Sequence, residues 1–189
     1  MKKIFPIALI VLGALFAAGG VYAVARGLDA KDQVKTELIA QDITTPADAR
    51  VPNVAVKDAA TAKVMADIIN KHALEASGGK TYSEMGRYLA LDGTDTNDAA
   101  KAMKGADGKP LANPVRNTLF QASSLRTSLY TSIMAFNVSD LVVGLGLMIL
   151  VLGIAVGGIG IALAALVIPA LAKKAHVEPV LTTGKPVTA

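Results

Sequence analysis

LVVGLGLMILVLGIAVGGIGIALAALVIPALA, residues 141–172, is the most informative part of this chain, because its 32 residues include no charged side chain. A second uncharged run of 22 residues, IFPIALIVLGALFAAGGVYAVA, occupies residues 4–25. A helix needs about 20 apolar residues to cross a bilayer, so each run can form one transmembrane helix. The two runs exclude a wholly soluble enzyme and predict an all-α membrane protein whose two spans flank a mainly helical domain.

Charge is distributed unevenly along the 189 residues, and its distribution predicts the topology. Residues 26–140 carry 14 basic and 14 acidic side chains, so the net charge of +4 lies on the two ends. Lysine-rich flanks stay in the cytoplasm, whereas a long neutral segment can be translocated. We therefore expect a protein of the cytoplasmic membrane, with both termini inside and residues 26–140 outside. The remaining parts are a tip and first span at 1–25, a second span at 141–172 and a cytoplasmic tail at 173–189.

The first apolar run has a second interpretation. A basic start, an apolar run and the sequence AVA at 23–25 are also typical of a signal peptide with an A-x-A cleavage site. The run is longer than the roughly 7–15 residues of a usual signal-peptide core, and as a helix it reaches about 33 Å. An uncleaved anchor is the favoured interpretation, and a cleaved signal peptide is the alternative.

Small residues recur at helical spacing on both spans. In lipid, helices gain little from hydrophobic burial, so small side chains favour association because they let two backbones approach closely. The simplest expectation is that the two spans pack into a hairpin. A second chain as the partner, and a composition without structural meaning, are the alternatives. The candidate helix-packing residues are Gly13, Ala17, Gly20, Gly153, Gly157, Gly160 and Ala164.

The segment between the spans reads as helices separated by turns. Apolar spacing predicts helices over 30–43 and 59–77. A capping-box pattern that begins at Thr81 predicts a shorter helix through Leu91. Residues 92–113 are rich in turn formers around a short alanine stretch, for which we expect a short helix within an inserted loop.

A long helix is expected to begin at about Pro114 and to run into the second span. Its apolar stripe faces inward, and its other side is rich in serine and threonine. This polar side carries little charge, so it suits water, lipid headgroups or a protein partner. The possible docking face consists of Ser124, Arg126, Thr127 and Thr131.

Two segments carry a resemblance to a known family. INKHALEASGGKTYSEM at 69–85 and SSLRTSLYTSIMAF at 123–136, followed by the glycine-rich span, resemble a family of small two-span actinobacterial membrane proteins. Automated naming often describes that family as aromatic ring-opening dioxygenase-like. The resemblance covers residues 62–160 fairly well, with 92–113 as an insertion. It implies a hairpin in the cell membrane and supplies no catalytic residue.

The chain lacks the residues that dioxygenase chemistry needs. Non-haem iron sites of that kind use two histidines and a carboxylate. The two histidines are His72 and His176, and the expected topology places them on opposite sides of the membrane. There is no cysteine, no Walker loop and no G-x-S-x-G motif. We therefore expect no enzyme activity, cofactor, metal, nucleic acid or small-molecule substrate. The spacing of Asp95, Asn97 and Asp98 also fails the calcium-loop rule.

Three functional interpretations follow. The first is a structural or accessory subunit, whose partners are membrane lipid and other membrane-protein subunits or a second copy of itself. The second is an extracytoplasmic binding or sensing module for a lipid, a quinone or an envelope component. The third is a homo-oligomeric pore, which is disfavoured because residues 141–172 contain no charged group to replace an ion's hydration shell.

Overall fold

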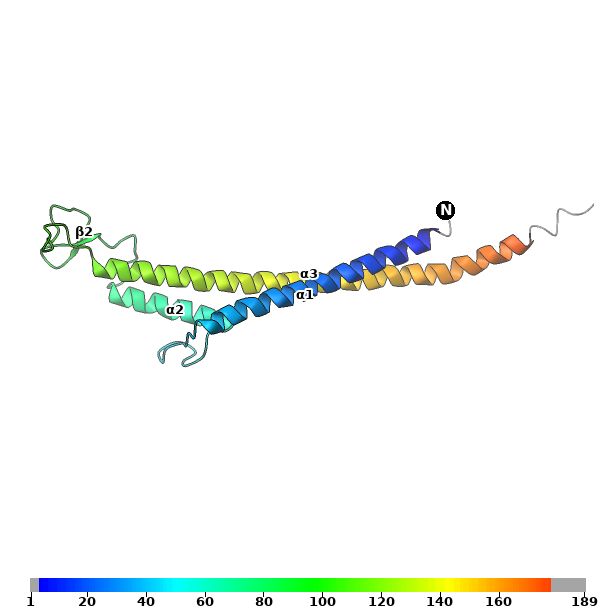
Figure 1. Ribbon diagram of the computed structural model, residues 1–189, viewed down its shortest axis with the longest axis horizontal. Coiled ribbons are helices and arrows are strands. Elements are labelled where there is room, and N and C mark those ends of the chain that lie inside the picture. Colours follow the sequence, from blue (N-terminus) through cyan, green and yellow to red (C-terminus); the bar gives the residue numbers. More distant parts are fainter. Residues whose placement is uncertain (1–3, 178–189) are drawn as a thin grey trace, which may run out of the picture. The chain divides into compact units, whose positions relative to one another are not determined.

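The computed structural model describes residues 4–177, and this part of the chain is mostly helical (Figure 1). Its elements are α1 (Ile4–Ala40), α2 (Ala59–Ala76), β1 (Tyr88–Leu89), β2 (Asp95–Thr96) and α3 (Pro114–Val177). The chain divides into two compact units. Unit 1 comprises Met1–Ala30 and Ser139–Ala189, and unit 2 comprises Lys31–Val138. Positions 1–3 and 178–189, which include two terminal lysines, Glu178 and Lys185, lie outside the described residues.

Two of the helices are long and apolar enough to cross a membrane, as the sequence predicts. They are α1 and the part of α3 that ends at Leu166. Only 17% of the most apolar window of α1 and 11% of that of α3 are buried within the protein. The core helix of a soluble protein is mostly buried, so this exposure is typical of helices that face lipid.

α1 is one uninterrupted helix, whereas the sequence favoured a span ending near residue 25 and a separate helix over 30–43. The joining segment contains Gly27 but no proline, and one glycine weakens a helix by only about 1 kcal/mol relative to alanine. An exposed ion pair, with 3.0 Å between Arg26 Nη1 and Asp29 Oδ2, supports the same turn. The helix ends at Ala40 rather than at residue 43, because Asp42 adopts a left-handed conformation with φ 50°.

α3 begins where the sequence predicts a long helix, and it continues through the second apolar run to Val177, beyond the expected end at residue 172. The buried side chain of Asn113 accepts a hydrogen bond from Val115 N–H at 3.0 Å, which caps the first turn. Pro114 occupies the first helical position, where its missing N–H has no helical partner to lose.

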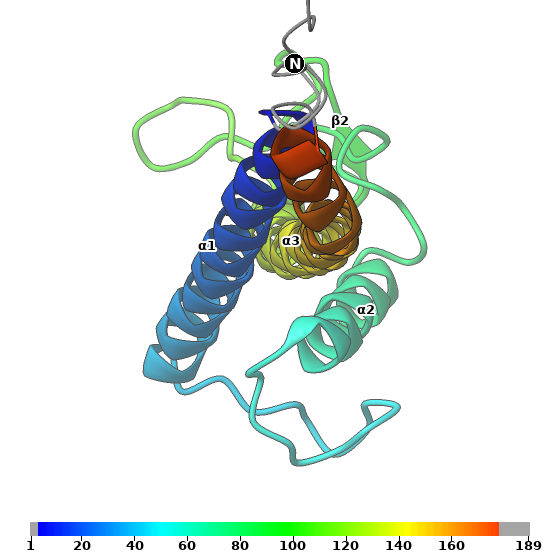
Figure 2. The same ribbon diagram turned by 90° about the vertical axis from the view of Figure 1, so that its right-hand side faces the viewer.

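The core of unit 2 joins α2 to the parts of α1 and α3 that belong to this unit. Leu38 of α1, Ala66 of α2 and Phe136 of α3 are buried together. Alanine on the contact face of α2 keeps that helix close to its neighbours. The loop between α1 and α2 (Figure 2) is held by Thr45, which is 1% exposed. Its hydroxyl donates to Val51 O at 2.7 Å and accepts from Val54 N–H at 3.0 Å.

α2 is capped at both ends, within one residue of the predicted limits of 59–77. Asp58 Oδ1 accepts from Thr61 N–H at 2.8 Å, and Thr61 Oγ1 accepts from Asp58 N–H at 3.1 Å. This reciprocal pair forms a capping box that satisfies two backbone donors. At the other end, Gly79 N–H donates to Leu74 O at 2.7 Å, and Gly79 has φ 88°.

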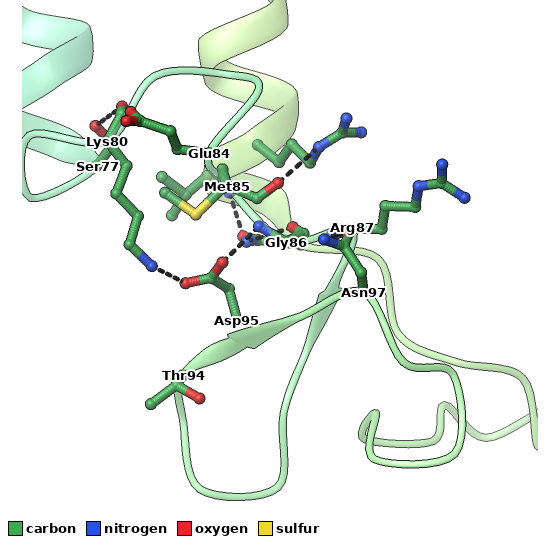
Figure 3. A network of polar contacts seen from close by, with 12 residues as sticks. Ser77, Lys80, Glu84, Met85, Gly86, Arg87, Thr94, Asp95 and Asn97 are labelled. Carbon is green, nitrogen blue, oxygen red and sulfur yellow. Dashed lines mark hydrogen bonds and ion pairs between the residues drawn. The ribbon is translucent and has the colours of Figure 1, made fainter.

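The predicted helix from Thr81 to Leu91 is wrong. The capping-box contact exists, since Glu84 Oε2 accepts from Thr81 N–H at 2.8 Å, but it closes a single turn. The chain then enters an antiparallel hairpin in which Tyr88 pairs with Thr96. Asp95 explains the change: its carboxylate accepts from Gly86 N–H and forms an ion pair with Lys80 (Figure 3). These non-local contacts outweigh the local helical signal.

The expected short helix within residues 92–113 is also absent from the structure. The alanine stretch instead forms a turn followed by an isolated β-bridge between Ala90 and Ala102. Lys104 forms a second bridge with Pro110. Asn113 ties the end of this segment to the chain just before β1, since its side-chain amide donates to Gly86 O at 3.1 Å. Residues 92–113 are therefore a hydrogen-bonded part of unit 2.

The capping box at α2 gives a first prediction. Asp58→Ala removes the acceptor for Thr61 N–H, and we expect it to lower the free energy of local opening of α2 by about 1 kcal/mol. Hydrogen exchange of the α2 amides in the full chain measures this value. Asp67→Ala is the matched control, because Asp67 forms only an exposed pair with Lys63. Equal losses in both variants would contradict the capping role.

The hairpin gives a pH prediction. The pKa of Asp95 is lowered, first by the hydrogen bond from Lys80 and then by the one from Gly86 N–H. A lowered folded-state pKa stabilises the fold above the unfolded value of about 3.9, and this stabilisation is lost as the pH falls through the folded value. We therefore expect the hairpin amides to lose protection below about pH 4, after correction for intrinsic exchange rates.

Asp95→Asn isolates the contribution of this carboxylate from those of the other acidic side chains. In this variant the hairpin amides should be less protected from exchange at pH 6, and their protection should change less between pH 6 and pH 3. Asp107→Asn is the control, because the Asp107 side chain is 60% exposed and its polar contacts within the described residues are with neighbouring Lys109. A pH profile of Asp95→Asn identical to that of the unmodified chain would refute this role.

Candidate functional site

The candidate packing residues of unit 1 meet across an antiparallel contact between α1 and α3. A Cβ added to Gly13 would lie 2.4 Å from the backbone nitrogen of Gly157. A Cβ on Gly153 would lie 2.4 Å from the backbone nitrogen of Ala17. Real Cβ atoms essentially never approach other atoms this closely, so the two backbones touch at these points. The structure thus places the stripe inside the chain's own hairpin.

Two further glycines belong to this contact, and the sequence analysis missed both. A Cβ on Gly27 would lie 2.7 Å from Val143 Cγ2, and one on Gly146 would lie 2.8 Å from Val24 N. A sequence pattern could have identified them, because glycine recurs at every seventh residue on both helices. This spacing is typical of two helices that supercoil in a left-handed sense. The buried glycines with this spacing are Gly13, Gly20 and Gly27 on α1, and Gly146, Gly153 and Gly160 on α3.

The other predicted members are less tightly held. A Cβ on Gly157 would be 3.7 Å from Gly13 Cα, an ordinary van der Waals distance. Ala164 is half-buried. Gly19, Gly144 and Gly158 are exposed and would meet nothing within 4 Å. On the outward surface of the described hairpin, the glycines are therefore isolated from one another and do not form a continuous stripe for helix packing.

The residues of the predicted docking face differ in burial and in their contacts. Ser124, Thr127 and Thr131 are exposed, and each hydroxyl donates to a carbonyl of its own helix at 2.9–3.0 Å. Arg126 is half-buried and lines a small hollow together with Asn70 of α2. Its Nε is buried without a hydrogen-bond partner among the described residues.

Unit 2 contains a groove of about 810 Å³ between α1, α2 and α3. The volume lies within the usual range of roughly 300–1,000 Å³ for small-molecule sites. Met65 and Ile69 of α2 are half-buried because they line this groove. The other apolar lining residues are Val34, Leu38, Ile43, Leu125, Leu129 and Ala135.

The polar lining residues of the groove come from two helices. Gln33 and Glu37 are four residues apart on the same side of α1, and Gln41 follows directly after the end of that helix at Ala40. Ser128, Thr131 and Ser132 come from α3, and each hydroxyl donates to the carbonyl four residues earlier. These hydroxyls therefore offer acceptor lone pairs to a ligand, and Glu37 adds an acceptor-only carboxylate.

A second hollow, the arginine cleft, has a volume of about 300 Å³ and lies beside the start of α3. Tyr82 and Phe120 form a tilted ring pair with centroids 5.9 Å apart. The guanidinium carbon of Arg116 lies 4.0 Å from the Tyr82 ring centroid, and Arg116 Nε donates to Met85 O at 3.0 Å. Arg87 lines the same cleft. The sequence analysis did not bring these residues together.

The polar atoms of the histidine and aspartate candidates are used by the protein itself. His72 Nε2 lies 2.7 Å from Asp48 Oδ2, and this contact is the largest cause of the lowered pKa of Asp48. Asn97 Oδ1 accepts from Arg87 N–H, and Asp98 Oδ1 accepts from Ala100 N–H. Among residues 4–177, no group of three or more His, Asp or Glu side chains is arranged to hold a metal ion.

The hairpin contact gives a third prediction. Gly153→Ala places a methyl group against the backbone of α1, and overpacking of this kind destabilises by about 1–3 kcal/mol. Gly158→Ala is the matched control, since its Cβ would point into open space. Reversible unfolding of the full chain in mild detergent measures both. Equal stability of the two variants would contradict the close contact.

Comparisons with known proteins complete the description of these sites. No protein-family model, curated protein or solved structure matches the chain. The resemblance to small two-span actinobacterial proteins therefore stays an expectation, and the function is inferred from the groove, the cleft and the hairpin themselves.

Proposed function

We propose that this protein is a membrane-anchored, non-enzymatic binding module that holds an amphiphilic envelope component in the groove of unit 2. The observation that carries the proposal is a groove of about 810 Å³ with an apolar lining and a limited set of polar groups. Ligand sites typically combine these features, because apolar walls supply affinity and a few polar groups set orientation.

The polar lining favours a particular kind of headgroup. Glu37 disfavours an anionic ligand, and the hydroxyls of Ser128, Thr131 and Ser132 act as acceptors because their protons are already donated. Gln33 and Gln41 each add an amide that both donates and accepts, so a headgroup with hydroxyls, which also do both, matches this rim more fully than a quinone, whose carbonyls only accept. The proposed ligand is therefore a lipid with a neutral or cationic, donor-rich headgroup, such as a glycolipid.

The apolar helices and the charge pattern support a location in the cytoplasmic membrane. Two helices are long and apolar enough to span it, and their most apolar windows are largely exposed. The excess positive charge lies on the terminal flanks, which favours cytoplasmic termini and an extracytoplasmic unit 2. In this orientation the groove would be available to envelope lipids.

A second candidate function is an accessory subunit of a membrane complex. It is favoured by apolar side chains on α3 that are exposed and do not line the groove. Phe120, Met134 and Val138 are 55%, 61% and 53% exposed, respectively. Met134 and Val138 are four residues apart and therefore lie on the same side of α3, where an exposed apolar pair suits contact with a protein partner. The buried heptad glycines are already used within the hairpin and do not support this interpretation.

One pair of variants tests both candidates. Leu125 lines the groove and is 56% exposed, whereas Met134 is 61% exposed on the same helix and does not line it. We expect Leu125→Glu to abolish lipid retention, because it adds a charge to the apolar wall, and Met134→Glu to keep it. Native mass spectrometry of the full chain released from mild detergent measures the retained lipid.

The outcomes separate the two functions. Loss of lipid in Leu125→Glu alone supports the binding module. Loss of a co-purifying protein in Met134→Glu alone supports the accessory subunit. An unmodified chain that retains no lipid after extraction from its own membrane overturns the primary proposal.

A further inference from the structure

The arginine cleft carries an inference that is independent of the groove. Its main lining residues are Tyr82, Arg87, Asn113, Arg116, Asn117 and Phe120. They include two cations and no carboxylate. A small cleft lined by two arginines without an acid places two positive charges near each other. A bound anion would reduce their mutual repulsion.

The two guanidinium groups are available to a ligand. Arg87 makes no side-chain hydrogen bond or ion pair within residues 4–177, and its side chain points away from the Asp95 network in Figure 3. Arg116 uses only Nε, which leaves its two terminal nitrogens without a partner among the described residues. The nearby acids are engaged elsewhere: Asp95 with Lys80, and Glu84 with Thr81.

Arg116 is also positioned before any ligand arrives. Its Nε–Met85 O hydrogen bond and its stacking on Tyr82 restrict the rotation of the side chain. Less side-chain entropy is then lost on binding, which increases affinity. Asn113 is buried and already makes two hydrogen bonds, so it shapes the wall of the cleft rather than contacting a ligand.

We propose that the arginine cleft binds a phosphate monoester attached to a flat ring or a sugar. Guanidinium groups bind phosphate through paired N–H donors, and a phosphate dianion matches the charge of two arginines better than a carboxylate does. The Tyr82–Phe120 pair supplies an adjacent aromatic surface for the ring. The volume of about 300 Å³ corresponds to roughly ten water molecules, which is enough for both parts.

Binding of phenyl phosphate tests the site. The full chain is placed in phosphatidylcholine nanodiscs and titrated calorimetrically at low salt. We expect saturable binding of one phenyl phosphate per chain, with inorganic phosphate and benzoate at least tenfold weaker. Arg87→Ala should weaken phenyl phosphate binding at least tenfold, and Arg87→Lys should give an intermediate loss because it keeps the charge but not the planar fork.

Two controls keep the test specific. Arg50→Ala removes the same charge from an exposed arginine outside the cleft and should leave binding unchanged. Phe120→Ser should remove the preference for phenyl phosphate over inorganic phosphate, and Phe120 is exposed enough for the fold to tolerate the change. Absence of saturable binding to the unmodified chain overturns the proposal. Equal weakening by Arg50→Ala, or tighter binding of benzoate, does so too.

The source of the phosphate is a separate arm of the same experiment. Nanodiscs that contain phosphatidic acid supply a phosphate monoester from a lipid. Competition with phenyl phosphate in these discs, lost in Arg87→Ala, would support the cleft and assign it a lipid headgroup. Unchanged phenyl phosphate binding would support the cleft and assign it a soluble ligand.

Discussion

Backbone contact between α1 and α3 is the constraint on which unit 1 depends. Six buried glycines recur at every seventh residue on the two helices, and at several of them an added methyl group would overlap the opposite backbone. Helices in lipid gain little from apolar burial, so their attraction relies on close van der Waals contact. This requirement explains why apolar runs of such length contain so many glycines and alanines.

The same two helices use different chemistry in unit 2. There, the contacts are made by Leu38 and Phe136, with Ala66 of α2 between larger neighbours. Large buried side chains stabilise a fold through removal of apolar surface from water, and they separate backbones more widely than glycines do. The groove of unit 2 lies beside Leu129, among such larger side chains. A change of side-chain size along one pair of helices thus produces a tight contact in one unit and a ligand-sized hollow in the other.

The sequence predicted the helices that carry a strong local signal and failed where distant residues decide the structure. Apolar spacing predicted the bounds of α2 to within one residue, and Pro114 predicted the start of α3. The segment 81–91 was mispredicted because Asp95, which holds the hairpin, lies outside the window in which helical periodicity is read. The groove and the arginine cleft combine residues separated by many turns of chain, so no local pattern indicates them.

The residue that follows Asn113 protects its buried side-chain amide from deamidation. This side chain joins Gly86 to the first turn of α3, and both functions require an amide with one donor end and one acceptor end. Asparagine usually deamidates when the next backbone nitrogen attacks its side chain to form a cyclic imide. The next residue is Pro114, whose nitrogen carries no hydrogen and is closed to that reaction. The contact between Gly86 and the start of α3 is therefore protected from deamidation by this route. The chain also contains no cysteine that could be oxidised.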